Sequence, residues 1–232
     1  MGLLKLLPLI LSVNRRGGVP PSAADPAFQG ARNRTLERDG YACRYCGFTA
    51  KKYQEIHFLS GNYKDLSDKN LVTACVFCHQ CLNLDRAGAM GSGALIFCPE
   101  IDQVTLHHVA RAIYVARKTQ GPMADAARMA MNALLSRKDE AVTRIGTNDP
   151  RLLSAVMREL LELTSYKRRA EVLDGIRLMP IDKRTIQENE NEGFDQFPQI
   201  LAFWRSTNGP YGKTLPPTWP AMLQSVMEKQ AA

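Results

Sequence analysis

The fold is decided by two C-x-x-C motifs, Cys43-Arg44-Tyr45-Cys46 and Cys75-Val76-Phe77-Cys78, which residues 47–74 separate. Each motif places two sulfurs on one tight turn. A fold that joins the two turns offers four thiolates in a tetrahedron, the coordination that structural Zn²⁺ sites use. Four thiolates leave no open position for water, so such an ion would stabilise the fold and perform no chemistry. We predict one structural Zn²⁺, bound by Cys43, Cys46, Cys75 and Cys78. Disulfides are the alternative.

The two remaining cysteines give weaker signals. Cys81 extends the second motif to C-x-x-C-x-x-C and could be a spare ligand. A helix starting near Cys78 would instead turn it into the core, where a free cysteine behaves as a small apolar side chain. Cys98 follows an apolar run and is predicted to be a buried strand residue. Six reduced cysteines with one metal set imply a reducing, cytoplasmic compartment.

Composition sets wide bounds on function. The 232 residues suffice for one large or two small domains, and an apolar share of 45% is typical of a soluble globular protein. Lys and Arg exceed Asp and Glu by 30 to 23, a net charge of +7. This surplus suits nucleic acid, an anionic membrane face or an acidic protein tail alike. A nucleic-acid-binding module without catalysis would rest on this charge alone.

The N-terminal apolar run, Leu3–Val13, could be taken for a signal peptide. Pro8 interrupts it, however, and Asn14-Arg15-Arg16 follow where small residues would mark a cleavage site. The run is too short to span a bilayer, and no other segment approaches that length. We expect a first strand tucked into the sheet, followed by a turn-rich linker over residues 17–26.

Hydrophobic periodicity and turn residues predict the elements around the two motifs. We expect helices over 28–37 and 79–85, strands over 53–59, 71–74 and 94–97, and a flexible loop over 88–93. After Pro99 the chain becomes helical, with helices over about 102–118 and 123–135. A third helix should start at Asp149-Pro150 and bury Leu152, Leu153, Val156, Leu160 and Leu161.

The last part of the chain is less regular. A shorter helix over 165–175 should lead to an extended segment over 177–179. Residues 187–193 form a polar hinge, and apolar residues at helical spacing follow from Phe194 to Trp204. From Gly209 the proline-rich tail is predicted to be irregular.

The first motif also lies in a wider pattern. The run from Arg38 to Gly47, then Asn70-Leu71-Val72, then Cys75-x-x-Cys78-His79, resembles an HNH endonuclease. In that family four cysteines hold a ββα finger, and a separate cation serves catalysis. The resemblance implies a general base, a residue that orients the finger and a cation ligand, at His57, Asn70 and His79 respectively.

The HNH pattern fails at the residue before the base, where a second cation ligand is required. This chain has Ile56, and an apolar side chain cannot coordinate a hard cation. Glu55 is one residue away, which in a strand means the opposite face. The alternative is that His57 and His79 are surface or packing histidines and that Asn70 caps a turn.

A second resemblance covers residues 28–180. It is carried by the segments Tyr53–Ile56, Asn70–Cys81, Ala94–Glu100 and Ile176–Pro180, which occur in this order. In these features the chain is similar to the IcmJ (DotN) family of type IVB secretion systems. The resemblance implies an HNH-like but non-catalytic subunit of the cytoplasmic coupling complex, which clasps the C-terminal tail of the coupling ATPase.

We therefore predict a zinc-stabilised adaptor and no enzyme. Its partners would be the ATPase tail and other coupling-complex subunits, with no nucleic acid and no membrane span. It would be cytoplasmic and peripheral at the inner membrane through that complex. An HNH-type metal-dependent DNA endonuclease is the alternative function.

The predicted fold class is α+β, with an HNH-like (treble-clef, ββα) zinc module with short strands followed by a helical region. The predicted divisions are an N-terminal strand and linker (1–27), the zinc-binding module (28–100), a helical region packed on it (101–186), and a polar hinge with an amphipathic helix and the proline-rich tail (187–232).

Overall fold

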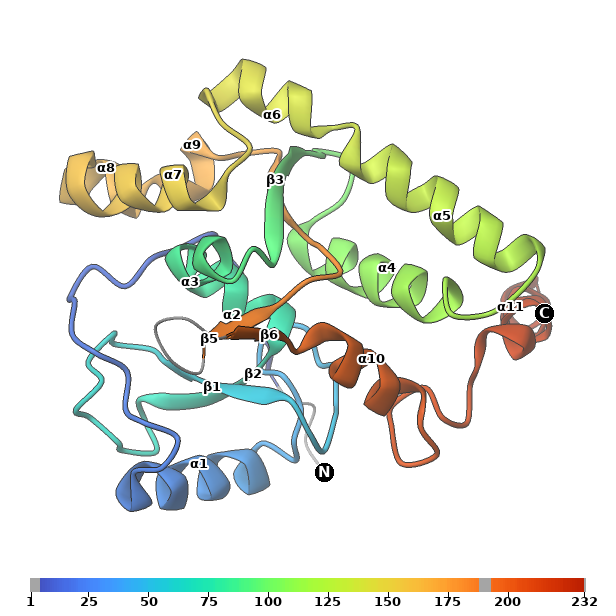
Figure 1. Cartoon of the computed structure of the whole chain (residues 1–232), viewed down its shortest axis with the longest axis horizontal. Helices are drawn as coiled ribbons and strands as arrows, with labels where there is room; N and C mark the ends of the chain where they lie inside the picture. Colours follow the sequence, from blue (N-terminus) through green and yellow to red (C-terminus); the bar gives the residue numbers. More distant parts are fainter. Residues whose placement is uncertain (1–4, 188–192, 232) are drawn as a thin grey trace.

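The computed structural model describes residues 5–187 and 193–231. Helices alternate with short antiparallel strand pairs, which confirms the predicted α+β class. Figure 1 shows β1 and β2 at a lower level of the molecule than β3, with helices around them. None of the helices in this described part of the chain has the length and apolar character needed to span a bilayer.

The first half of the chain builds the region that carries the cysteines. Helix α1 (Pro26–Arg38) begins where the Asp25 side chain accepts hydrogen bonds from the first-turn amides. Strands β1 (Gln54–Phe58) and β2 (Leu71–Cys75) pair antiparallel, with His57 opposite Val72. Helices α2 (Val76–Leu82) and α3 (Leu84–Ala89) follow directly. We call the segment from Ala42 to Leu82 the cysteine finger.

The second strand pair closes a long excursion of the chain. Strand β3 (Gly93–Phe97) pairs antiparallel with β4 (Ile176–Pro180). The segment between them forms α4 (Gln103–Ala116), α5 (Pro122–Leu135), α6 (Lys138–Ile145), α7 (Pro150–Ala155), the π-helical turn η1 (Val156–Leu160), α8 (Leu163–Lys167) and α9 (Arg169–Val172). The predicted boundary at residue 100 stays a prediction; β3 and β4 lie on either side of it.

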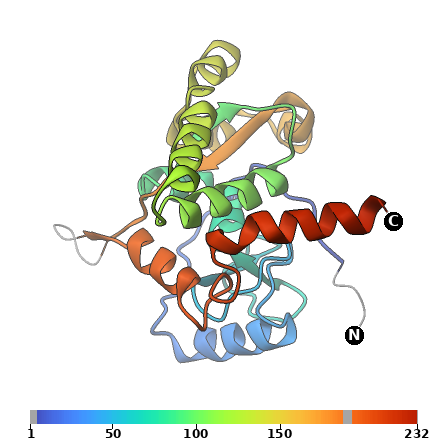
Figure 2. The same cartoon turned by 90° about the vertical axis from the view of Figure 1, so that its right-hand side faces the viewer.

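The C-terminal part returns to the finger. A small hairpin, β5 (Thr185–Gln187) and β6 (Gly193–Asp195), leads to α10 (Phe197–Arg205). The 3₁₀ turn η2 (Pro216–Thr218) and helix α11 (Trp219–Ala231) follow. Figure 2 shows α11 on the outside of the molecule, between the level of α4 and that of α1.

The largest apolar core joins the finger to α4 and α10. The four motif cysteines belong to it, together with four aromatic side chains from three helices: Phe77, Tyr114, Phe197 and Trp204. The ring centroids of Phe77 and Trp204 lie 5.5 Å apart and those of Tyr114 and Phe197 4.8 Å apart, in edge-to-face geometry. The finger is therefore packed into the body of the protein.

Several predicted elements are confirmed, among them α1, β1, β2, β3, α4 and α10. Asp102 caps α4 by accepting a hydrogen bond from Thr105, as its position in the sequence predicts. The predicted helix over 79–85 is split into α2 and α3 at Asn83. Part of the predicted polar hinge, residues 188–192, lies outside the described residues.

Other predictions are wrong. The N-terminal run forms no strand within its described part; it is held by single backbone contacts, such as Ser12 N to the Cys81 carbonyl at 2.8 Å. Helix α3 occupies the start of the predicted glycine loop, and α6 was not predicted. The proline-rich tail is irregular as predicted only as far as Leu215, because η2 starts at Pro216 and α11 follows it. Leu152, Val156 and Leu160 are 58%, 41% and 76% exposed, whereas Leu153 and Met157 are buried, so this segment buries the neighbouring face.

Candidate metal centre

The fold brings the two C-x-x-C motifs together. The sulfurs of Cys43, Cys46, Cys75 and Cys78 all lie within 4.8 Å of one another, and all four residues are buried. Their sequence neighbours supply the geometry. Gly47 has a φ of +74°, which closes the first turn, and its amide donates to the Cys43 carbonyl. Cys75 is the N-cap of α2, and its sulfur accepts from the Cys78 amide.

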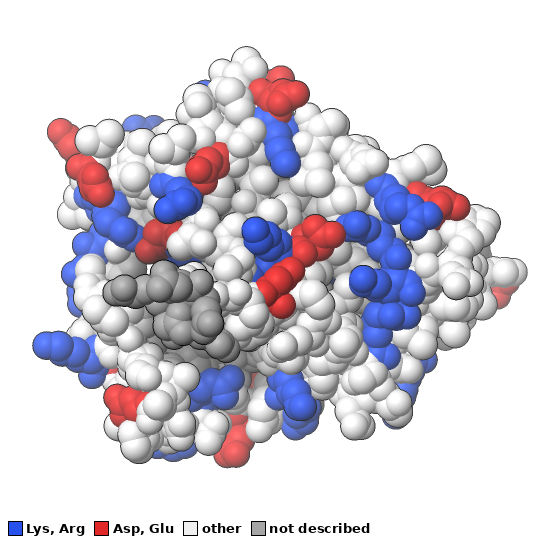
Figure 3. All heavy atoms as spheres, in the orientation of Figure 1, with Lys and Arg blue, Asp and Glu red and all other residues white. Residues whose placement is uncertain are grey.

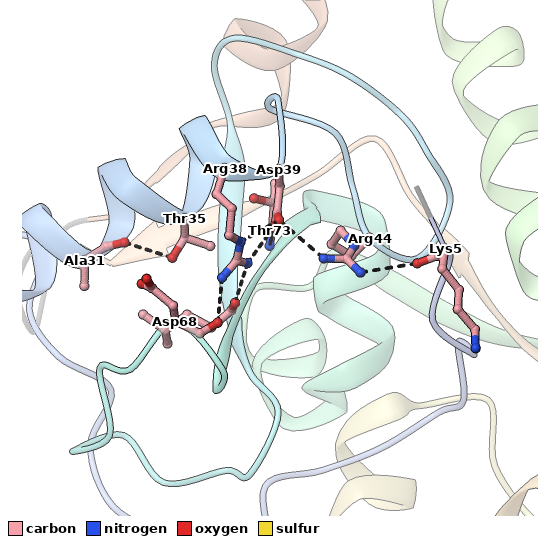
Figure 4. Close-up of polar contacts among 9 residues, drawn as sticks. Lys5, Ala31, Thr35, Arg38, Asp39, Arg44, Asp68 and Thr73 are labelled. Carbon is pink, nitrogen blue, oxygen red and sulfur yellow. Dashed lines mark hydrogen bonds and ion pairs between the residues drawn. The ribbon is translucent and has the colours of Figure 1, made fainter. Parts of the chain in front are cut away.

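A second group of side chains fixes the first turn against β2. Asp39, only 3% exposed, accepts hydrogen bonds from the Arg38 side chain (2.9 Å) and the Thr73 amide (2.8 Å), and Arg44 lies 3.4 Å from it. Figure 4 shows this network between the end of α1, strand β2 and the N-terminal segment at Lys5. Burial raises the pKa of the Asp39 carboxyl, but the hydrogen bonds from Arg38 and Thr73 outweigh it and lower that pKa below its usual range.

Arg111 is the residue that sequence reasoning missed. Its side chain is fully buried, and its Nη2 donates to the sulfurs of Cys46 and Cys75 at 3.1 Å each. Its guanidinium also lies over the Phe48 ring, 4.2 Å from the centroid. No carboxylate among the described residues pairs with it. A buried cation requires a counter-charge, and the two sulfurs are in position to supply it as thiolates.

His107 supplies a further donor. Gln103 donates from Nε2 to the Leu178 carbonyl and accepts at Oε1 from the Leu178 amide, both at 2.8 Å, which fixes its orientation. The Gln103 Nε2 therefore also donates to His107 Nε2, 2.9 Å away, so the ring proton is on Nδ1. That Nδ1 lies 3.4 Å from the Cys78 sulfur. Burial lowers the pKa of His107 to about 3, which keeps the ring neutral.

The sulfurs thus sit among hydrogen-bond donors. Burial opposes ionisation of Cys75, but hydrogen bonds from the neighbouring cysteines and the charge of Arg111 lower its pKa well below the ordinary value. Burial raises the pKa values of Cys43 and Cys78. Zn²⁺ with four thiolates keeps a net negative charge, which Arg111 partly balances, and donors to ligand sulfurs are the usual surroundings of such an ion. The donor set and its neighbours therefore fit a closed structural metal site.

No family model matches the chain. The chain is 31% identical over 160 residues to the type 4 apparatus protein DotN of Legionella pneumophila subsp. pneumophila (strain Philadelphia 1), an alignment that covers 67% of this chain and 74% of that protein. The chain belongs to the DotN family. The family resemblance found in the sequence is thereby confirmed.

The other two cysteines of this DotN family member lie outside the cluster. Cys81 is fully buried, and its sulfur lies 3.5 Å from His107 Nε2. It is a core residue, as the helix position predicts, and the spare-ligand alternative finds no support in the cluster of four. Cys98 is buried, but it lies one residue beyond the end of β3.

The three positions implied by the HNH resemblance have separate surroundings. Asn70 accepts from the Ser60 amide and donates to the carbonyls of Asn62 and Asp65, so it closes the loop between β1 and β2. That is the predicted turn-capping role. The ring centroids of His57 and His79 lie 6.2 Å apart, and burial lowers the pKa of His57 to about 4 and that of His79 to about 3.

The residues beside His57 divide between the two faces of β1. Ile56 is buried in an apolar cluster with Leu36 and Leu71, away from the His57 side of the strand. Glu55 is on the same side as His57, and its carboxylate lies 2.5 Å from Arg184 Nη2. Burial raises the pKa of Glu55, but the surrounding positive charges, including that of Arg184, lower it overall. The one carboxylate that strand β1 itself carries is therefore held in an ion pair.

Proposed function

We propose that this chain is a zinc-stabilised, non-catalytic adaptor subunit of a type IVB secretion coupling complex. The observation that carries the proposal is the match to a type 4 apparatus protein over 160 residues, 67% of this chain. The order β1, β2, α2 supports an HNH-like ββα finger, in which the second motif spans the junction of β2 and α2. One Zn²⁺ bound by Cys43, Cys46, Cys75 and Cys78 would hold this finger.

The proposed partner is the C-terminal tail of the coupling ATPase, together with other subunits of the complex. The net charge of +7 would favour an acidic tail, mainly by raising the association rate. Figure 3 shows acidic and basic side chains interspersed over one face, with a band of basic side chains in the region of α4 and α10. We place the protein in the cytoplasm, attached to the inner membrane through the complex.

Exposed apolar side chains also support a protein partner. Leu152, Leu160 and Leu163 are 58%, 76% and 60% exposed, and they follow one another along α7, η1 and α8. We call these three elements the helical arm. Neighbouring exposed apolar side chains are typical of protein-binding surfaces. The arm is therefore the first surface to mutate in a test of partner binding.

Co-expression tests the proposal directly. The full chain and the ATPase tail should elute as one complex from a size-exclusion column at moderate salt. Leu160→Asp in the arm should weaken that complex, whereas Glu140→Gln on exposed α6, chosen as a control, should not. Failure of the wild-type chain to bind the tail, together with intact secretion after deletion of the gene, would contradict the adaptor function.

The alternative function is a metal-dependent DNA endonuclease, and the proximity of the His57 and His79 rings favours it. Against it, Ile56 is packed in the core and Glu55 is already paired with Arg184. We expect no nicking of plasmid DNA above background with Mg²⁺, Mn²⁺ or Ni²⁺. Nicking that His57→Ala abolishes would establish the nuclease instead.

A further inference from the structure

The N-terminal segment lines a cavity that the adaptor function does not use. The cavity has a volume of about 630 Å³ and lies between residues 8–23, strand β1 and helix α2. In Figure 1 this segment runs down one side of the molecule from the level of α3 to α1. A volume of this size is typical of sites that take a small organic molecule.

The segment is held in place, so the cavity is preformed. Ser12 forms backbone hydrogen bonds with Cys81 and Leu84. Asn14 Nδ2 donates to the Gly61 carbonyl at 2.9 Å. Gly61 has a φ of +70°, and a Cβ there would lie 2.8 Å from Asn14 Oδ1, so only glycine allows this contact.

The charge around the cavity is unbalanced. Among the residues that the structure describes, its lining contains one carboxylate, Glu55, which Arg184 already pairs. The lining also contains five arginines: Arg15, Arg16, Arg32, Arg86 and Arg169. None of the five forms an ion pair with a carboxylate of the described chain; Arg15, Arg32 and Arg169 donate to neutral oxygens such as the carbonyls of Leu161, Gln54 and Leu11.

An apolar wall lines another part of the cavity, on the opposite face of β1 from Glu55. The rings of Phe28 and Phe58 are stacked with their centroids 6.0 Å apart, and Tyr63 lies edge-on to Phe58 at 5.1 Å. All three line the cavity. Arginine forks bind phosphate through paired hydrogen bonds, and an aromatic wall suits a flat apolar ring.

We propose that this cavity binds a small phosphate-bearing molecule that carries a flat ring. The volume favours a small ligand over a nucleic-acid duplex, because about 630 Å³ is the size of a small-molecule site. The arginines would bind the phosphate, and the aromatic side chains of Phe28, Phe58 and Tyr63 would contact the ring. This inference is independent of the adaptor function: ligand binding in the cavity does not depend on binding of the ATPase tail, nor the reverse.

Calorimetry on the full zinc-loaded chain at low salt tests it, with pyrophosphate, AMP and adenosine as probes. Pyrophosphate and AMP should bind saturably at millimolar concentration, and adenosine should bind far more weakly. Arg86→Gln should weaken AMP binding by about tenfold or more, because it removes a charged hydrogen-bond donor. Arg34→Gln is the matched control, since Arg34 is an exposed residue of α1 that does not line the cavity.

Wild-type protein gives a readout that needs no variant. The ring signals of His57, which lines the cavity, should shift on addition of pyrophosphate, while those of His108, which does not, should stay. Absence of binding by both phosphate probes, or equal weakening by Arg34→Gln and Arg86→Gln, would overturn the proposal. Duplex DNA that competes with AMP for the same site would overturn the small-ligand assignment.

Discussion

The cysteine finger and the helical arm differ in what keeps each in place. In the finger, every residue of α2 is buried, and the sulfurs have donors from Arg111, His107 and the chain itself. In the arm, three leucines are more than half exposed, and η1 departs from α-helical geometry. The finger is therefore specified by interactions inside the protein. The arm has apolar surface that the described part of the chain leaves uncovered, which suits a region that another molecule stabilises.

The largest difference in stability between the finger and the arm is expected when one of the four clustered cysteines of the finger is replaced. Cys75→Ser should cost about 5 kcal/mol or more, because a structural zinc site contributes on the order of 10–16 kcal/mol and a typical domain has a net stability of only roughly 5–15 kcal/mol. Elemental analysis should show the loss of about one zinc, and circular dichroism should show a loss of structure. Cys98→Ser, outside the cluster, should keep the metal. A folded wild-type sample without zinc would contradict the metal assignment.

The second test removes the buried charge beside the sulfurs. Arg111→Leu should destabilise the protein by about 2–4 kcal/mol and weaken zinc binding by roughly tenfold to a hundredfold, because two thiolates lose their donor. Competition with a chelator measures the zinc affinity. Arg117→Leu on the same helix is the control: its ion pair with Asp182 is partly exposed and should contribute about 1 kcal/mol or less. Equal effects of the two changes would show that Arg111 has no specific role at the metal.

The third test concerns pH. The folded-state pKa of Asp39 is depressed, so its stabilising contribution is fully present above the ordinary carboxyl pKa of about 3.9 and is lost as the pH falls through the folded value. Asp39→Asn should cost about 2 kcal/mol at neutral pH, and its difference from wild type should shrink below about pH 4. Urea melts at both pH values measure this difference.

Asp68→Asn is the control for that series, because Asp68 accepts from Arg38 through its backbone carbonyl, at 2.6 Å, which the substitution leaves in place. It should leave the stability nearly unchanged at both pH values. A difference between Asp39→Asn and wild type that stays constant with pH would mean that the Asp39 charge does not matter.

The smallest effect is expected in the arm. Leu160→Ser should change the free energy of unfolding by no more than about 0.5 kcal/mol, because the side chain is 76% exposed. Leu153→Ala, at a buried position of α7, should cost roughly 2–5 kcal/mol. Chemical unfolding of both variants compares them. A large loss on Leu160→Ser would show that the arm is as tightly specified as the finger.

Short-range signals predicted much of this molecule. Asp102 predicts the start of α4, because a side-chain cap acts within one turn of its own position; Asp25 caps α1 in the same way but lies within the predicted linker. The two motifs predict the metal cluster for the same reason: each pair of sulfurs is local. The prediction for α7 and η1 was wrong at several positions, because apolar residues occupy two neighbouring faces and the sequence does not show which face is buried: Leu153 is buried, whereas Leu152 is exposed.

The sequence by itself determined the four cysteines, the α+β class and the family. The tertiary structure alone decided that Asn70 closes a turn, that Arg111 and His107 face the sulfurs, that Glu55 is paired with Arg184, and that residues 8–23 line a cavity. Arg111 is separated from Cys46 by 65 positions and Glu55 from Arg184 by 129. Caps, motifs and periodicity act over a few residues, whereas a buried charge is placed by whichever distant elements pack against it.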